Sequence, residues 1–364
     1  MPECRRAGHL AWEQEGVLLC WGGVMEHRYS KPKGPNRTPS CGNSFHAPDQ
    51  VATYCPCSRV CGVLRVGGEV PRAVAGAVGV VLEGGLLVWG GLALGEEGSF
   101  YICSTSRDLH FLEVERRAWS RLQPEGEAAP ASEKGVGWSW AGKAYFFSGY
   151  TRDGECAEQA RTRGFAWEEG DGGGWHSALT AYSPRTGAWS WPQTRGTSPS
   201  PRAGAAAAVL GDSVYIFGGR GRRGRMDDLH SLHLPSLSWR QVQPCSWPDV
   251  WAPPSTLRPA PRALHSLTAL PCQALAMYGG LGQLHAPLQV LSLLLLLLHN
   301  PPTGPVAVPP LHRGVARGRA CLRPRGGEVL ARGRGGGRGA APELGPHAGV
   351  LPHQVRLRLM SDFN

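Results

Sequence analysis

The 364-residue sequence predicts an all-β protein, a β-propeller built from repeated sheets, followed by a low-complexity C-terminal tail. Composition gives the first indication, because 51 glycines and 31 prolines accompany only 18% charged residues. That mixture is typical of a turn-rich β protein, or of a globular part joined to a low-complexity part. Internal repetition gives the second indication. We therefore expect a propeller over residues 1–290 and a tail over residues 291–364.

Three segments that end in tryptophan carry the repeat. Residues 108–119 (DLHFLEVERRAW) and 228–239 (DLHSLHLPSLSW) share Asp, Leu, His, Leu and Trp at an offset of 120 residues (228 − 108). Residues 178–189 (ALTAYSPRTGAW) keep a leucine and the final tryptophan. We expect Trp119, Trp189 and Trp239 to serve in packing.

Each of these segments lies downstream of a short apolar run that ends in small residues. Five such runs occur, at 18–23 (LLCWGG), 86–91 (LLVWGG), 144–149 (AYFFSG), 214–219 (VYIFGG) and 275–280 (LAMYGG). An arginine precedes the first glycine of four runs by 16, 18, 16 and 17 residues, counted from Arg6, Arg72, Arg202 and Arg262. Glycine allows the positive φ of tight turns, and short apolar runs suit strands buried on both faces. Such units must stack to bury their faces, which favours a propeller over the alternative, a β-sandwich.

The unit resembles the kelch repeat, which combines a Gly-Gly doublet with a tryptophan further along. Five blades are recognisable up to about Leu288, and the resemblance implies a sixth. More narrowly, the segments FGGRGRRGRMDDLHSLHLPSLSW, PRALHSLT and EKGVGWSWAGKAYFFSGY resemble kelch domain-containing substrate receptors of cullin-2 RING ubiquitin ligases. This resemblance implies a non-catalytic receptor for proteins whose chains end in glycine, with elongin B/C and cullin-2 as partners. The helical box that docks those partners is not recognisable in this sequence.

The resemblance also implies a pocket for the terminal carboxylate of a substrate. Carried over by position, Arg220, Arg225 and Lys134 would bind the carboxylate. Tyr150 and Trp175 would form the pocket walls. The chemistry agrees, because arginine binds a carboxylate through two parallel hydrogen bonds and lysine adds a point charge. Capture of a terminal carboxylate is a known mode of peptide recognition.

Each of these residues also has a simpler interpretation. Arg220 and Arg225 could be solvated loop arginines, as we expect of Arg222 and Arg223, because charge runs are normally surface features. Trp175, which follows a glycine run, could serve in packing within its blade.

Two positions depart from the family that the sequence resembles. The relatives have a Ser-Trp pair where this chain has Ala263 and Leu264. Loss of a hydroxyl donor and an aromatic wall would cost about 1–3 kcal/mol of binding free energy. We therefore expect the pocket to be weakened or retuned.

Most of the positive charge lies in the tail. The formal net charge is +10, and residues 301–364 contribute ten arginines, no lysine and three acidic residues, or 10 − 3 = +7. Within the tail, residues 319–330 (RACLRPRGGEVL) are a faint remnant of a sixth blade. We hypothesise that the tail is disordered or arises from alternative splicing or a shifted reading frame, because arginine without lysine fits GC-rich codons. RNA binding through the Arg/Gly segment is the alternative, and nucleic acid is otherwise not an expected partner.

Other chemistry finds little support in the sequence. Cys55, Cys57 and Cys61 with Cys41 or His46 lack the spacing of a zinc finger or ribbon, so no metal or cofactor is expected. Hydrolase, metalloprotease and phosphate-binding motifs are absent, and no catalytic residue is expected. The apolar run at 288–298 is too short to span a bilayer. Eleven cysteines without a signal peptide indicate an intracellular protein of the nucleus or cytoplasm. A generic kelch interaction scaffold, without ligase recruitment, is the remaining alternative.

Overall fold

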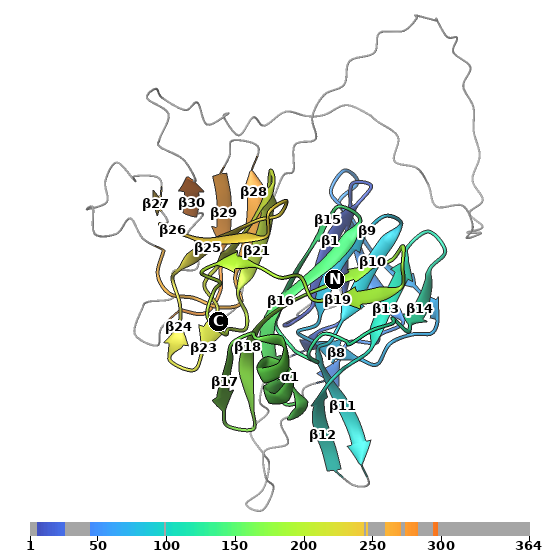
Figure 1. Cartoon of the computed structure of the whole chain (residues 1–364). Coiled ribbons are helices and arrows are strands. Elements are labelled where there is room, and N and C mark those ends of the chain that lie inside the picture. Colours follow the sequence, from blue (N-terminus) through green and yellow to red (C-terminus); the bar gives the residue numbers. More distant parts are fainter. Residues whose placement is uncertain are drawn as a thin grey trace, which may run out of the picture. The chain divides into compact units, whose positions relative to one another are not determined.

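The computed structural model describes residues 6–25, 44–97, 100–243, 245–246, 259–270, 274–282 and 294–297. All of them belong to one compact unit, residues 1–305. Over these ranges the chain forms five successive, mainly antiparallel sheets, three smaller sheets of two or three strands, and a single α-helix (Figure 1). The predicted all-β architecture with five recognisable blades is therefore confirmed. The tail predicted beyond residue 305, including the sixth-blade remnant at 319–330, lies outside the described residues.

The first two sheets share one plan, in which consecutive strands pair as a meander. The first sheet has the order β1 (Leu10–Gln14), β2 (Val17–Trp21), β5 (Gln50–Cys55) and β6 (Val60–Arg65). The second has the order β9 (Val78–Leu82), β10 (Gly85–Trp89), β13 (Leu109–Glu113) and β14 (Ala118–Leu122), with the short β7 (Gly67–Gly68) parallel to β14.

The next three sheets repeat the plan. The third comprises β15 (Val136–Trp140), β16 (Lys143–Thr151), β18 (Gly173–Ser183) and β19 (Ala188–Ser190), with β17 (Trp167–Gly170) also paired to β18. The fourth comprises β21 (Ala206–Leu210), β22 (Ser213–Phe217), β25 (Leu229–His233) and β26 (Ser238–Val242), with β20 (Arg195–Gly196) parallel to β26. The fifth comprises β28 (Ser266–Leu270), β29 (Ala274–Tyr278), β30 (Leu294–Leu297) and β27 (Cys245–Ser246).

Strand β30 comes from the leucine run of the sequence. It pairs with β29 from Ala274↔Leu297 to Met277↔Leu294. The fifth sheet therefore takes in residues beyond the boundary at 290 that the sequence predicts, and where the tail begins stays a prediction.

Short hairpins extend several sheets past their Gly-Gly doublets. They are β3 (Val24–Met25) with β4 (Ser44–Phe45), β11 (Leu92–Glu97) with β12 (Phe100–Thr105), and β23 (Arg220–Gly221) with β24 (Gly224–Arg225), while β8 (Val74–Ala75) pairs with β11. In the third sheet the long strands β16 and β18 provide the extension themselves (Figure 1). These extensions carry the candidate site.

Tryptophans join the second, third and fourth sheets each to the one before it. The ring centroids of Trp119 and Trp21 lie 4.9 Å apart, those of Trp189 and Trp89 lie 5.0 Å apart, and those of Trp239 and Phe147 lie 5.1 Å apart. In every pair the second aromatic residue directly precedes the doublet position of the previous sheet. Such pairs contribute about 0.5–1.5 kcal/mol each beyond the area they bury. The predicted packing role of Trp119, Trp189 and Trp239 is confirmed, and all three are buried.

A chain of backbone hydrogen bonds runs from sheet to sheet. Its members, here called the ring residues, each lie two positions before the first strand of their sheet: Gly8, Gly76, Lys134, Gly204 and Leu264. Each N–H donates to the carbonyl oxygen of the preceding ring residue, with N···O distances of 2.7, 2.6, 2.6 and 2.7 Å. All five have a positive φ between 58° and 68°. Glycine adopts that conformation without cost, whereas Lys134 and Leu264 hold it under strain.

The ring also corrects one alignment made from the sequence. The position two residues before the ring residue is held by Arg6, Arg202 and Arg262 in three of the sheets. In the second sheet Val74 holds it. The hydrogen bonds show this, because Gly23 N–H donates to the Val74 carbonyl just as Gly149 N–H donates to the Arg202 carbonyl. Arg72 lies two residues too early and is exposed. The longer spacing of 18 residues counted from Arg72 was the sign of this slip.

Candidate functional site: a basic and aromatic cluster on neighbouring blades

Tyr150 and Arg220 occupy equivalent positions in the third and fourth sheets. Each directly follows the second residue of its doublet, and each exchanges two backbone hydrogen bonds with the residue before its ring residue. For Tyr150 that partner is Glu133, and for Arg220 it is Ala203. We call this position the rim position; Val24, Leu92 and Leu281 occupy it in the other sheets. The repeat thus presents one side chain per blade at the same level.

The other two predicted residues are the cross-strand partners of these rim residues. Trp175 on β18 is paired with Tyr150 on β16, and Arg225 on β24 is paired with Arg220 on β23. The rings of Tyr150 and Trp175 meet edge to face, with centroids 5.1 Å apart at 66°. The Tyr150 hydroxyl donates to the carbonyl oxygen of Asp171 at 2.9 Å, which fixes the aromatic wall in place.

Lys134 lies between these two pairs. Its carbonyl oxygen accepts a hydrogen bond from Gly204 N–H, and Gly204 adjoins the Ala203 that pairs with Arg220. Its ammonium group contacts the Glu133 carboxylate at 2.9 Å. The side chain of Glu133 is only 2% exposed, so this carboxylate needs a cationic partner.

Arg152 is a further basic residue that the sequence reasoning missed. Its Nη1 lies 3.6 Å from the second oxygen of Glu133, and its guanidinium carbon lies 5.4 Å from the Tyr150 ring centroid. Glu133 was missed as well. Both residues lie close to predicted ones, since Glu133 precedes Lys134 and Arg152 is two residues from Tyr150. The sequence did contain a sign of Glu133, because the residue before the ring residue is alanine in the other four repeats and an acid only here.

The cluster has an excess of positive charge. Its four cationic side chains are those of Lys134, Arg152, Arg220 and Arg225. Lys134 and Arg152 contact the buried Glu133, and the Glu168 carboxylate accepts a hydrogen bond from Arg222 N–H at 3.3 Å, so the balance is 4 − 2 = +2. The Nε of Arg225 is buried and has no hydrogen-bond partner among the residues that the structure describes. Arg225 as a whole is half-buried, whereas Arg220 is exposed, and Arg222 and Arg223 at the tip of the same hairpin are exposed, as expected. A buried guanidinium N–H without an acceptor favours an anionic ligand.

A second polar network lies beneath the fourth blade and serves the fold. Arg202 is fully buried and binds Asp228 through two hydrogen bonds of 2.7 and 2.8 Å, while His230 Nε2 lies 2.9 Å from the same carboxylate. Burial alone raises the pKa of Asp228, but hydrogen bonds from Arg202 and His230 outweigh it and hold that pKa below its usual range. Arg202 also donates to the Gly218 carbonyl at 2.9 Å and so anchors the doublet beneath Arg220.

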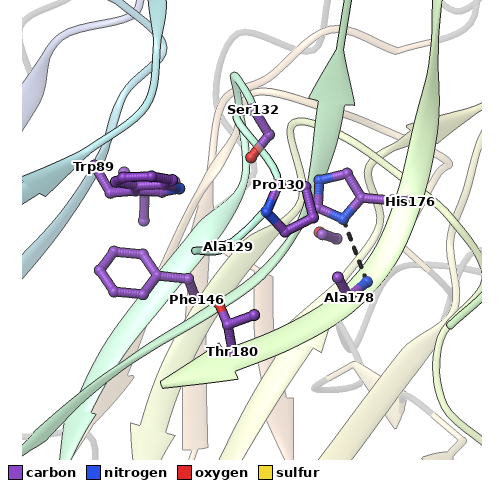
Figure 2. Close-up of a pocket in the computed structure, with 10 residues that line it drawn as sticks. Trp89, Ala129, Pro130, Ser132, Phe146, His176, Ala178 and Thr180 are labelled. Atoms are coloured by element: carbon purple, nitrogen blue, oxygen red, sulfur yellow. Dashed lines mark hydrogen bonds between the residues drawn. The ribbon is translucent and has the colours of Figure 1, made fainter. Parts of the chain in front are cut away.

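In the third blade the equivalent space is a small cavity. Ser132 and Ala178 stand where the fourth blade has Arg202 and Asp228, and the cavity between them measures about 10 Å³, room for one water molecule (Figure 2). His176 faces it, and its Nδ1 accepts a hydrogen bond from Ala178 N–H at 3.3 Å (Figure 2). Burial lowers the pKa of His176 to about 3, so this ring is neutral. The cavity is too small for a cofactor or substrate.

A larger cavity of about 340 Å³ lies beside the second sheet, with Arg72, Arg107 and Arg121 in its wall. Arg121 is paired with Asp108 at 2.6 Å, and Arg107 is paired with Asp153 and Glu155. Two of the three arginines therefore already have acidic partners, which makes this cavity a weaker anion site than the cluster.

The described residues offer little for other chemistry. No group of three histidine, cysteine or acidic side chains in the described ranges could hold a metal ion, and Cys41 lies outside them. None of the helical segments in the described part is long and apolar enough to cross a membrane. The one helix, α1 (Glu155–Arg163), is an insertion between β16 and β17.

Comparisons with known proteins agree with this architecture. Residues 8–280 match the KLHDC2/KLHL20/DRC7 Kelch-repeats domain. The chain is 29% identical over 291 residues to kelch domain-containing protein 1 of Mus musculus, covering 78% of this chain and 64% of that protein. It is 28% identical over 285 residues to kelch domain-containing protein 2 of Bos taurus, covering 76% and 63%. The sequence resemblance to these two proteins is thereby confirmed.

A solved structure supports the fold alone. The structure of YjhT superposes with a TM-score of 0.52 at 18% sequence identity, covering 76% of this chain and 73% of that one. With the family match, it confirms the predicted kelch propeller. The chain spans somewhat less than two thirds of the curated relatives named above.

Proposed function

Because this chain belongs to the KLHDC2/KLHL20/DRC7 Kelch-repeats domain family, we propose that it is a substrate-recognition protein that binds the C-terminal carboxylate of other proteins. Kelch repeats generally form non-catalytic interaction modules. In this proposal Arg220, Arg225 and Lys134 bind the carboxylate, and Tyr150 and Trp175 form the walls. No catalytic residue and no cofactor take part.

The observation that carries the proposal is the buried, unpartnered Nε of Arg225 beside the rim arginine Arg220, among the described residues. A planar carboxylate can accept parallel hydrogen bonds from a guanidinium, so a chain end is a suitable ligand. Lys134 shares its charge with Glu133, which leaves the arginines as the stronger anion ligands. The aromatic pair of Tyr150 and Trp175 limits the space beside the carboxylate.

The family resemblance motivates a second, wider proposal. We propose that the protein delivers bound substrates to a cullin-2 RING ubiquitin ligase through elongin B/C, which would make the chain end a degradation signal. The alternatives are a kelch scaffold without ligase recruitment, or RNA binding through the Arg/Gly tail. Co-purification of tagged full-length protein with elongin B/C separates the ligase role from the scaffold role.

Fluorescence polarisation with the full-length chain tests the carboxylate pocket. The probe is a labelled ten-residue peptide ending in Gly-Gly with a free carboxylate, beside the same peptide amidated. We expect amidation to weaken binding at least tenfold, because it removes the negative charge and one acceptor oxygen. Arg225→Ala should weaken binding of the free acid similarly.

The matched control is Arg223→Ala, which removes an exposed arginine from the same hairpin and should leave the dissociation constant unchanged. Equal binding of acid and amide, or equal losses in both arginine variants, would show that only net charge attracts the peptide. Tight binding of single-stranded RNA with no peptide binding would favour the tail instead.

A further inference from the structure

Two exposed leucines stand beside the basic cluster. Leu264 is 52% exposed and Leu281 is 49% exposed, and both belong to the fifth blade. Leu264 is the ring residue of that blade, equivalent to Lys134, and Leu281 is its rim residue, equivalent to Arg220. The repeat therefore places both leucines at the level of the proposed carboxylate site, one blade further on.

The backbone links this pair directly to the arginines. Leu264 N–H donates to the Gly204 carbonyl at 2.7 Å, and Gly204 adjoins the Ala203 that pairs with Arg220. The Leu264 side chain lies over Gly204, because its Cδ2 is 3.0 Å from where a Cβ on that glycine would be. Leu281 exchanges backbone hydrogen bonds of 2.8 and 3.1 Å with Ala263.

Leu264 holds a conformation that leucine rarely adopts. Its φ is 61°, in a position where three of the five blades have glycine. A strained, exposed apolar residue at a ligand-facing position indicates a role in binding rather than in folding. The other exposed large hydrophobic residues of the described ranges, Leu18, Val60, Val63 and Val81, lie on the first two sheets.

Together these residues define a site with two chemistries, cations on the third and fourth blades and an aliphatic surface on the fifth. We propose that the protein selects chain ends that carry an aliphatic side chain within their last two residues. The carboxylate binds Arg220 and Arg225, and the aliphatic side chain packs against Leu264 and Leu281. This inference rests on the proposed function and specifies its substrate class, chain ends with an aliphatic side chain at one of the last two positions.

The test compares three labelled peptides of one parent sequence with free carboxylates, ending in Gly-Gly, Leu-Gly or Gly-Leu, against the full-length chain. We expect one or both leucine peptides to bind about tenfold more tightly than the Gly-Gly peptide. Leu264→Gly should remove this preference, and the variant should keep the fold because glycine is the common residue at ring positions.

Two further variants complete the design. Leu281→Ala should reduce the preference, whereas Leu18→Ala, equally apolar and 45% exposed on the first sheet, should not. Equal affinity for all three acids would overturn this inference while leaving the carboxylate pocket intact. Failure of every free-acid peptide to bind would overturn the proposed function, and this inference with it.

Discussion

Replacing Arg202 with methionine should lower the free energy of unfolding by about 3 kcal/mol. The side chain is fully buried, and its guanidinium donates to Ser200 O, Ser200 Oγ, Gly218 O and both oxygens of Asp228, at 2.7–3.0 Å. Methionine keeps the apolar volume but leaves the carboxylate without its cation. Loss of one partner of a buried ion pair costs about 3–5 kcal/mol, and the 24% exposure of Asp228 places this case at the lower end.

The fifth blade supplies the control. Arg262 is equivalent to Arg202, but it donates only to the carbonyl oxygens of Ala260 and Gly279, at 3.1 and 3.2 Å, and it has no ion pair with the described residues. Arg262→Met should therefore cost only about 1 kcal/mol. Urea unfolding followed by tryptophan fluorescence at pH 7 measures both variants.

Two results would refute this reasoning: equal losses in the two variants, or a loss below about 1 kcal/mol in Arg202→Met. The double variant with Asp228→Asn should recover about 1–2 kcal/mol, because it removes the uncompensated charge. A double variant less stable than Arg202→Met alone would show that Asp228 stabilises the fold through other contacts.

Two more predictions concern the third and fifth blades. Ser148→Gly should raise the unfolding free energy by about 1 kcal/mol, because Ser148 holds a φ of 58° at a doublet position and its buried Oγ has no partner among the described residues; a lower thermal midpoint would contradict this. Burial lowers the pKa of His176 and His265 to about 3, whereas the unfolded histidines protonate near 6.5, so the unfolded state binds more protons below pH 6.5. Stability should therefore fall as the pH drops from about 6.5 towards 3, by up to about 1.4 kcal/mol per pH unit for each histidine. Urea midpoints at pH 7, 6 and 5 measure this, and His176→Gln should be less pH-sensitive; a midpoint constant across that range would count against neutral burial.

The repeat was predictable because its signals are local. The doublets and the tryptophans recur with the period of the fold, and each lies where the sequence places it. The register of the second blade was not predictable, because Pro71-Arg72-Ala73 has the same sequence as Pro201-Arg202-Ala203 but lies two residues earlier in its repeat. Only the hydrogen-bonding pattern identifies Val74 as the true equivalent of Arg202.

The residues of the candidate site were also predictable only in part. Rim positions follow directly from the doublets, so Tyr150 and Arg220 could be placed from sequence. The pairing of Glu133 with Lys134 and Arg152 depends on the bridge between two segments, which spacing alone does not reveal. Helix α1 could have been recognised from acids in its first turn, arginines in its last and Gly164 at its end.

The chain of ring residues has a consequence for how this surface can evolve. Adjacent blades are joined there by backbone hydrogen bonds, and among the five ring residues only Lys134 and Leu264 carry a side chain. A substitution at Lys134 or Leu264 changes the side chain offered to a ligand and keeps the main-chain link, whereas a side chain at any of the three glycine positions would add strain. The charge at position 134 and the aliphatic side chain at position 264 can therefore change independently. After gene duplication, single substitutions at these positions can alter ligand preference while the backbone links between blades stay the same.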